Sequence, residues 1–150
     1  MRWYLIDRIL ECTPGKQIVG LKSFTRSEMF FMDHFHGFPI VPGVLQIEMM
    51  ATTGGKAIKL ADNSILPILG SVKSAKFIHN IRPGDQCKIF VEIEKLAKSY
   101  ALANGRVEVD DKTVSKATIM YGILPAETAD TNWKDPVMSE WCAANNIVRD

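Results

Sequence analysis

The strongest pattern of apolar and polar positions lies between residues 43 and 60. Apolar or small residues at positions 44, 47, 51, 55 and 58 follow the i, i+3, i+4 spacing that places side chains on one face of a helix. The preceding stretch Phe38–Val41 is held extended, because a residue that precedes a proline avoids the α region. Pro42 suits the first turn of a helix, where its missing N–H has no intrahelical role. We therefore predict a helix from about Gly43 to about Leu60.

Most of the remaining chain alternates between apolar and polar residues, which is the pattern of half-buried strands. Trp3–Leu10 is apolar and is predicted as a short strand or a turn. Turn residues at Thr13–Lys16, Arg82–Asp85 and Asp110-Asp111 separate the segments. Several strands that follow one central helix predict an α+β protein with a mostly antiparallel sheet. The predicted strands are Gln17–Phe24, Ile68–Ile78, Gln86–Leu96, Tyr100–Val109 and Thr113–Leu124.

The last part of the chain has a different character. Residues 126–132 are polar, and Asp135-Pro136 then offers an N-cap and a first-turn proline for a short helix. That helix would carry Val137, Met138, Trp141 and Cys142, and its Trp141 face could dock on the rest of the molecule. We expect one main domain over residues 1–125 and a C-terminal extension over residues 126–150.

Composition narrows the class of protein. A chain of 150 residues with 47% hydrophobic residues predicts a folded globular domain. The net charge of +1 gives no argument for nucleic acid as the main partner. Three widely spaced cysteines predict neither a disulfide framework nor a zinc site and fit a reducing cytoplasm. No stretch approaches the roughly 20 apolar residues of a membrane span.

The predicted helix contains one acid on its apolar side. Glu48 is expected beside Val44, Leu45, Ala51 and Thr52. Most helical glutamates are solvated, which is the plain structural interpretation. Burial, however, favours the neutral form of a carboxylic acid, and a neutral acid can act as a general acid near neutral pH. The residues alone leave these two interpretations about equally favoured.

Two further groups lie close to this acid in the sequence. His34 stands in the loop before the helix, where a histidine is more often structural but can also act as a base. Gly43 opens the helix, where free backbone N–H groups can hold an oxyanion, although Pro42-Gly43 is equally well explained as a helix entry. Nothing in the spacing of His34 and His36 predicts a metal site. A histidine base, a neutral acid and a backbone N–H together suit elimination of water from a β-hydroxy thioester.

These residues carry a resemblance to a known family. The stretch His34–Glu48 fits the pattern H-F-x-G-x-P-[IV]-x-P-G-V-L-x-[IL]-E, and the chain resembles the (3R)-3-hydroxyacyl-[acyl-carrier-protein] dehydratases of type II fatty acid synthesis. The resemblance runs from roughly Tyr4 to Leu124 and includes Leu5–Ile9, Pro14–Lys16, Ala75–Phe77 and Pro83–Asp85.

The resemblance implies a hotdog fold, in which a long helix is wrapped by a sheet, and a double-hotdog homodimer that can assemble further into a trimer of dimers. It implies that His34 and Glu48 are the catalytic pair and meet from different subunits, and that the N–H of Gly43 binds the thioester carbonyl. It implies no cofactor and no metal. The tunnel candidates are Phe31, Phe35, Pro42, Val44, Ala51 and Thr52. The candidates for docking the acidic helices of the acyl carrier protein are Arg2, Lys73, Lys76, His79 and Arg82.

Two positions depart from the family pattern and favour a specialised paralogue. His36 stands where the family has proline, and Thr52 stands where it has a glutamine that can contact the acid.

Two other functions remain as alternatives. A hotdog thioesterase would hydrolyse similar thioesters, but many of these lack the His34 loop. A non-catalytic acyl-binding subunit is disfavoured because both proposed catalytic residues are present.

Overall fold

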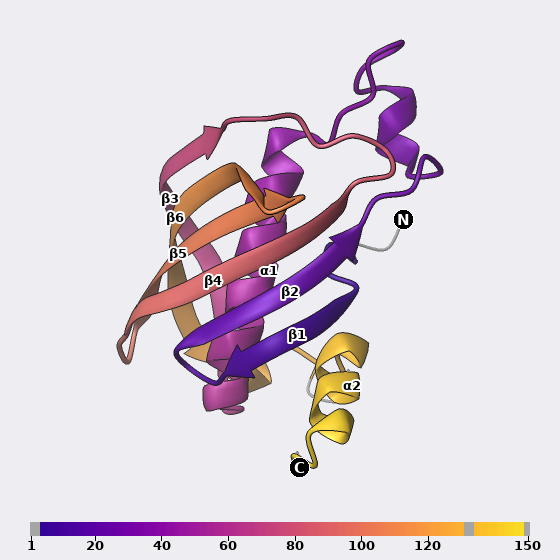
Figure 1. Ribbon diagram of the computed structural model, residues 1–150. Coiled ribbons are helices and arrows are strands. Elements are labelled where there is room, and N and C mark those ends of the chain that lie inside the picture. The colour runs from indigo at the N-terminus through magenta and orange to yellow at the C-terminus, as the bar shows by residue number, and fades with distance from the viewer. Residues whose placement is uncertain (1–3, 131–133, 149–150) are drawn as a thin grey trace.

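The computed structural model describes residues 4–130 and 134–148, so Arg2 lies outside the described residues. Its main element is a six-stranded sheet with the order β1-β2-β4-β5-β6-β3 (Figure 1). Every neighbouring pair is antiparallel, which confirms the predicted sheet type. The strands are β1 (Arg8–Thr13), β2 (Gln17–Ser23), β3 (Ile65–Phe77), β4 (Gln86–Leu96), β5 (Tyr100–Val109) and β6 (Lys112–Pro125).

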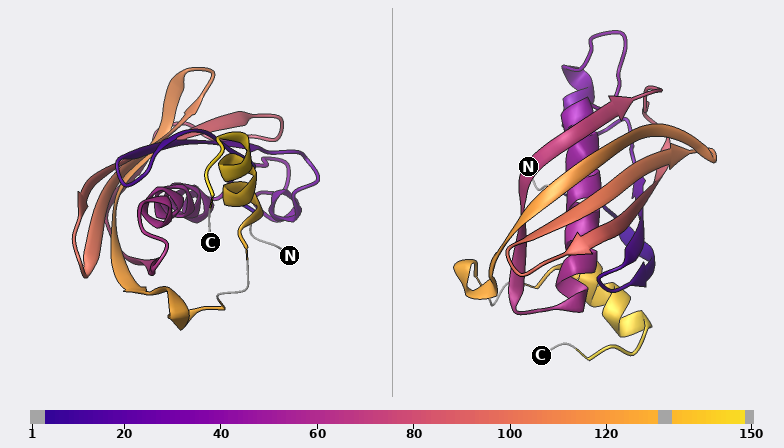
Figure 2. Two further views of the ribbon diagram at one scale, coloured as in Figure 1. Left: turned by 90° about the horizontal axis from the view of Figure 1, so that it is seen from below. Right: turned by 90° about the vertical axis from the view of Figure 1, so that its left-hand side faces the viewer.

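One long helix, α1 (Gly43–Ala61), lies against the concave side of this sheet, and the strands curve around it (Figures 1 and 2). The helix begins at the predicted residue and ends one residue after the predicted end. Its inward face is fully buried at Met49, Met50 and Ile58, where it meets the inward-facing side chains of the strands. Gly54 allows the closest approach, because a Cβ there would lie 2.4 Å from the Tyr121 hydroxyl. The helix and sheet therefore share one core.

Most strand predictions are confirmed, and the predicted inward face of β4 is buried at Cys87, Ile89 and Val91. Asp110 and Asp111 both have positive φ, as the hairpin turn between β5 and β6 requires. The first strand differs most, because β1 begins at Arg8 and runs to Thr13 instead of covering Trp3–Leu10. β3 starts at Ile65, three residues before the prediction. A proline at position 67 is tolerated because β3 is an edge strand, where one side makes no ladder bonds.

The predicted tail helix is also present. α2 (Pro136–Ala144) begins after the N-cap Asp135, whose side chain accepts hydrogen bonds from the N–H groups of Val137 and Met138. Val137, Met138 and Cys142 are buried, and α2 packs beside β1 (Figure 1). Two short 3-10 helices, Met29–Met32 and Ala126–Thr128, complete the described elements. Within the described ranges, no helix is long and apolar enough to cross a lipid bilayer.

The two edges of the sheet differ in how they are covered. The tail helix lies against β1 at one edge. At the other edge, β3 leaves large apolar side chains in solvent, with exposed fractions of 46% for Ile68 and 44% for Leu69. A long apolar edge strand is a ready surface for pairing with another strand.

Candidate active site

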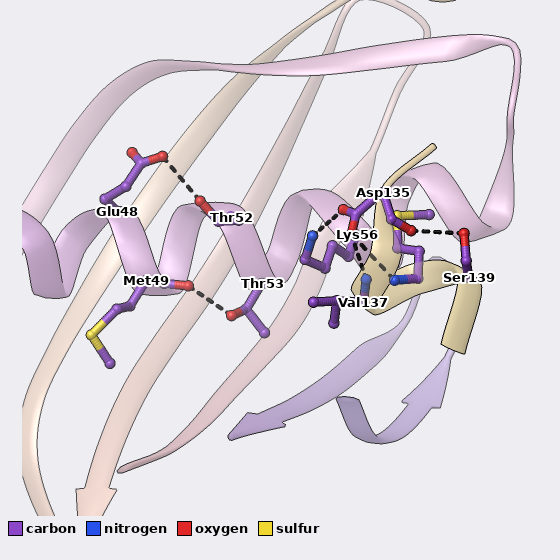
Figure 3. A network of polar contacts seen from close by, with 9 residues as sticks. Glu48, Met49, Thr52, Thr53, Lys56, Asp135, Val137 and Ser139 are labelled. Atoms are coloured by element: carbon purple, nitrogen blue, oxygen red, sulfur yellow. Dashed lines mark hydrogen bonds and ion pairs between the residues drawn. The ribbon is translucent and has the colours of Figure 1, made fainter. Parts of the chain in front are cut away.

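Glu48 lies in the second turn of α1 and is half-buried. The hydroxyl of Thr52, one turn later, donates a hydrogen bond of 3.0 Å to Glu48 Oε1 (Figure 3). Residues four apart lie on the same side of a helix, so this bond holds the carboxyl group against the surface of α1. The acid therefore has a defined polar partner at the position where the family resemblance expects glutamine.

Glu48 lines a cavity of about 830 Å³ beside α1. Ala51, Thr52 and Gly55 continue its wall along the same face of the helix, and Tyr121 of β6 contributes from the sheet. Segments far apart in the sequence form the other walls: the N-terminal residues at positions 4 and 6, the start of β3 at positions 66–69, and the tail at positions 135, 137 and 138. The cavity is a place where an apolar chain could lie next to a carboxyl group.

Tyr121 is buried behind this cavity. Its hydroxyl donates a hydrogen bond of 2.7 Å to the carbonyl oxygen of Ala51. Burial, with a smaller contribution from the nearby charge of Glu48, raises the pKa of Tyr121 well above its usual range. The phenol therefore keeps its proton to higher pH than a free tyrosine does, and it acts as a fixed donor to the helix backbone.

The start of α1 is held in place by backbone contacts. The N–H of Val41 bonds to the carbonyl of Ile81 at 2.8 Å, and the side-chain amide of Gln46 donates to the carbonyl of Val41 at 3.1 Å. The ring of Phe77, at the end of β3, lies over Gly43, where an added Cβ would stand 3.1 Å from the ring. Since the first N–H groups of a helix lack intrahelical partners, Gly43 can offer a donor beside an aromatic wall.

The His34 loop is ordered by its own backbone. The N–H of His34 donates to the carbonyl of Phe30, and its carbonyl accepts from the N–H of Ile40, both at 2.9 Å. Phe35 and Phe38 exchange two further hydrogen bonds of 2.9 Å. The imidazole of His34 is half-buried and stacks on the ring of Phe35, with centroids 3.9 Å apart. These bonds and the ring contact give the loop around the imidazole a defined shape, directly before α1 in the chain.

The predicted site residues fall into two groups. Glu48, Ala51 and Thr52 line the cavity together. In the described part of the chain, none of the residues that line the cavity comes from positions 31–44, where the other candidates lie. Of these, Phe31 is buried against Phe24 and Phe30, whereas Phe35 and Val44 are exposed and Pro42 and Gly43 are partly exposed.

The basic candidates lie on β3 and in the connection that follows it. Lys73 and Lys76 are on β3, close in sequence to Phe77, and His79 and Arg82 lie in the connection from β3 to β4. All four side chains are exposed.

Sequence reasoning missed the polar link at the other end of the cavity. Lys56 is buried with 8% of its surface exposed and forms an ion pair with Asp135 (Figure 3). The spacing of Glu48, Thr52 and Lys56, four residues each, was a visible signal of a polar row on one helix face. The acid that pairs with Lys56 could not be read from that row.

The fold defines the class of protein. A long helix wrapped by an antiparallel sheet is the hotdog fold, and solved structures share it. They include the smu.793 protein of Streptococcus mutans bound to acetyl CoA, with a TM-score of 0.67, 11% identity and coverage of 83% of this chain and 94% of that chain. The dehydratase heterocomplex ApeI:P of Xenorhabdus doucetiae gives a TM-score of 0.62, 20% identity and coverage of 75% and 92%.

The family follows from sequence similarity. The chain belongs to the family with the FabA-like domain, whose model matches residues 2–118. It is 41% identical over 122 residues to the 3-hydroxyacyl-[acyl-carrier-protein] dehydratase FabZ of Clostridium acetobutylicum, covering 80% of this chain and 86% of that protein. It is 38% identical over 121 residues to the protein of the same name in Desulforamulus reducens, covering 79% and 85%.

Proposed function

We propose that this chain dehydrates (3R)-3-hydroxyacyl thioesters on acyl carrier protein to trans-2-enoyl thioesters, in fatty acid or related lipid synthesis in the cytoplasm. The observation that carries the proposal is the position of Glu48, a carboxyl group with its own donor in the wall of a largely apolar cavity. Membership of the FabA-like family and similarity to dehydratases support the same reaction. Three free thiols fit a reducing compartment.

His34, Gly43 and Glu48 each have one role in the proposed reaction. The imidazole of His34 takes the proton from the α carbon, and the N–H of Gly43 stabilises the negative charge that develops on the thioester oxygen. The carboxyl group of Glu48 gives its proton to the β hydroxyl, which leaves as water while the double bond forms. The proton held by the imidazole then returns to the carboxylate, so that one water is released and the protein is unchanged.

The two halves of this site are proposed to come from different subunits. His34 lies at the N-terminal end of α1, whereas Glu48 lines a cavity to which the His34 loop does not contribute in the described residues. A two-fold dimer can bring the loop of one copy to the cavity of the other. The exposed apolar edge of β3 supports such a dimer, because pairing β3 with its copy would cover Ile68 and Leu69. We extend the proposal to a trimer of such dimers.

The carrier protein is proposed to dock beside the start of α1. Lys76 and Phe77 are neighbours on β3, and the Phe77 ring lies on Gly43. The exposed group Lys73, Lys76, His79 and Arg82 would therefore bind acidic helices near the proposed thioester site.

A two-signal assay tests the function. The protein is incubated with 3-hydroxyacyl thioesters of several chain lengths, on carrier protein and on CoA, while enoyl absorbance and free thiol are followed in parallel. We expect enoyl product without thiol release. Thiol release without enoyl product would make the chain a thioesterase, and the absence of both signals would make it an acyl-binding subunit.

A further inference from the structure

The C-terminal tail contributes to the same cavity as Glu48. Asp135, Val137 and Met138 line the cavity together with the acid, although they lie some 90 positions later in the chain. The family match ends at residue 118, so the tail lies beyond the part that is shared with the FabA-like family. Figure 2 shows α2 beside the C-terminal end of α1.

Distance along α1 places the tail at the far end of the cavity. Glu48 and Lys56 are eight residues apart, which corresponds to about 12 Å along a helix axis. Lys56 marks the point where Asp135 meets the helix (Figure 3). Met138 and Val137 are buried directly after this point, with apolar side chains that face the cavity. An alkyl chain that starts beside the acid and follows α1 would end against them.

The carboxyl group of Asp135 holds the wall that Val137 and Met138 form at the end of the cavity. Asp135 Oδ2 pairs with the buried ammonium of Lys56, while Oδ1 accepts the N–H groups of Val137 at 3.0 Å and Met138 at 3.3 Å. The hydroxyl of Ser139 also donates to the Asp135 carbonyl at 2.8 Å. A buried lysine that loses its partner is strongly unfavourable, so the ion pair and the helix cap hold the tail against α1 as a unit.

We infer that the tail closes the cavity and sets the longest acyl chain that the site accepts, with Val137 and Met138 as the residues that determine chain length and the Lys56–Asp135 pair as their anchor. This inference rests on the proposed function, because it names the acyl thioester as the occupant. The physical reason is burial: each methylene that finds room in an apolar cavity gains affinity, and each methylene that meets a wall loses it.

Substitutions of Met138 test whether the tail sets the longest acyl chain that the cavity accepts. Met138→Ala opens the far end and Met138→Trp fills it, while Ala143→Trp puts the same bulk on an exposed position of α2 as a control. The values of kcat/KM are measured for 3-hydroxyacyl thioesters from hydroxybutyryl to hydroxypalmitoyl. We expect Met138→Ala to favour longer chains and Met138→Trp to penalise them, by about fourfold for each methylene gained or displaced. The control should keep the wild-type profile.

A binding series separates this inference from the function. Saturated acyl-CoA thioesters of the same lengths lack the hydroxyl group, and their Kd values are measured by calorimetry for the same proteins. If the wild type forms no enoyl product but the Kd profile still shifts with Met138, the dehydratase function is wrong and the chain-length wall stands. The inference is wrong if the wild type and both Met138 variants show the same dependence of Kd on acyl chain length. It is also wrong if none of the proteins binds an acyl thioester of any length.

The anchor is tested by its effect on Cys142, which is buried on α2. Asp135→Asn keeps a capping side chain but leaves Lys56 without its anion, whereas the double variant Lys56→Met/Asp135→Asn removes both charges. We expect Asp135→Asn to speed alkylation of Cys142 by about tenfold or more. Cys87, which is also buried, is the internal control. The same variant should relax the chain-length limit. The double variant should restore slow alkylation. If Cys142 stays as slow in Asp135→Asn as in the wild type, the pair is not the anchor.

Discussion

Thr52 Oγ1 donates a hydrogen bond of 3.0 Å to Glu48 Oε1 within one turn of α1. In the dehydratase family that the chain resembles, the residue at this position is a glutamine that can contact the acid. The hydroxyl restores a polar contact with a shorter side chain. It holds one oxygen of a carboxyl group that lines the cavity. Thr52 is thus a positioning residue for the proposed acid.

We expect Thr52→Val, which replaces the hydroxyl with a methyl group of similar size, to lower kcat for dehydration by about tenfold. A hydrogen bond between neutral groups is worth about 0.5–1.5 kcal/mol, and its loss leaves the acid free to rotate. The KM should change less than kcat, since the cavity keeps its shape. Thr52→Ser keeps the donor and should recover most of the rate. Equal rates in the wild type and Thr52→Val would show that the bond does not position the acid.

A mixing experiment tests whether His34 and Glu48 act across subunits. His34→Ala and Glu48→Gln should each abolish dehydration while the oligomer persists. When the two inactive proteins are unfolded together and refolded in equal amounts, mixed dimers contain one intact site each, and about a quarter of wild-type activity should return. Each variant refolded alone is the control. If the mixture stays inactive although mixed dimers are detected by mass, the pair does not act between subunits.

Local periodicity predicted the strands better than the inward face of the helix. The predicted β4 face at Cys87, Ile89 and Val91 is buried. On α1 the predicted face is buried only at Ala51 and Ile58, whereas Val44 is 72% exposed and the fully buried face passes through Met49 and Met50. The same pattern was less informative for β3. Its apolar residues Ile68 and Leu69 are both exposed in the single chain, so alternation there cannot reveal an inward face.

The site was predictable only where its parts are close in sequence. Glu48, Ala51 and Thr52 share a helix face, and spacing alone places them together. The pairing of Lys56 with Asp135 joins residues 79 positions apart. Asp135 was recognised as an N-cap, but capping is a local property, and the face on which a later helix docks depends on the shape of the whole fold. For that reason the far wall of the cavity could be found only from the structure.

The adjacent glycines Gly54 and Gly55 offer a matched pair for testing how closely α1 approaches the sheet. A Cβ on Gly54 would lie 2.4 Å from the Tyr121 hydroxyl and 2.9 Å from Val91, whereas a Cβ on Gly55 would meet Pro67 at an ordinary 3.6 Å. Tyr121 cannot easily give way, because its hydroxyl is bonded to Ala51. We expect Gly54→Ala to lower the free energy of unfolding by about 2–3 kcal/mol.

Gly55→Ala should instead raise the free energy of unfolding by about 0.5–1 kcal/mol, because alanine restricts the unfolded chain and fits the helix without a clash. Urea denaturation of both variants, followed by circular dichroism, measures the difference. Equal effects of the two substitutions would mean that the helix does not lie against Tyr121 and Val91 as described.

The buried thiol of Cys87 predicts a loss of stability in alkali. Burial, with a smaller effect from the charge of Asp85, raises the pKa of Cys87 from 9.0 to about 12. In the unfolded chain the thiol ionises near pH 9.0, whereas in the folded protein it keeps its proton. Since the folded state then binds more protons, the free energy of unfolding falls as the pH rises from about 9 toward 12.

We expect Cys87→Ala to make this decline shallower by about 1.4 kcal/mol per pH unit between about pH 9.5 and pH 11. The measurement is a series of urea unfolding curves across that range, and the slope against pH is compared rather than the absolute stability. Val107→Ala, a truncation of a fully buried side chain on the neighbouring strand, controls for the loss of packing and should keep the wild-type slope. Parallel slopes in the wild type and Cys87→Ala would show that the thiol ionises as readily in the folded chain as in the unfolded one. The strand β4 would then have to open to solvent in alkali before the rest of the sheet unfolds.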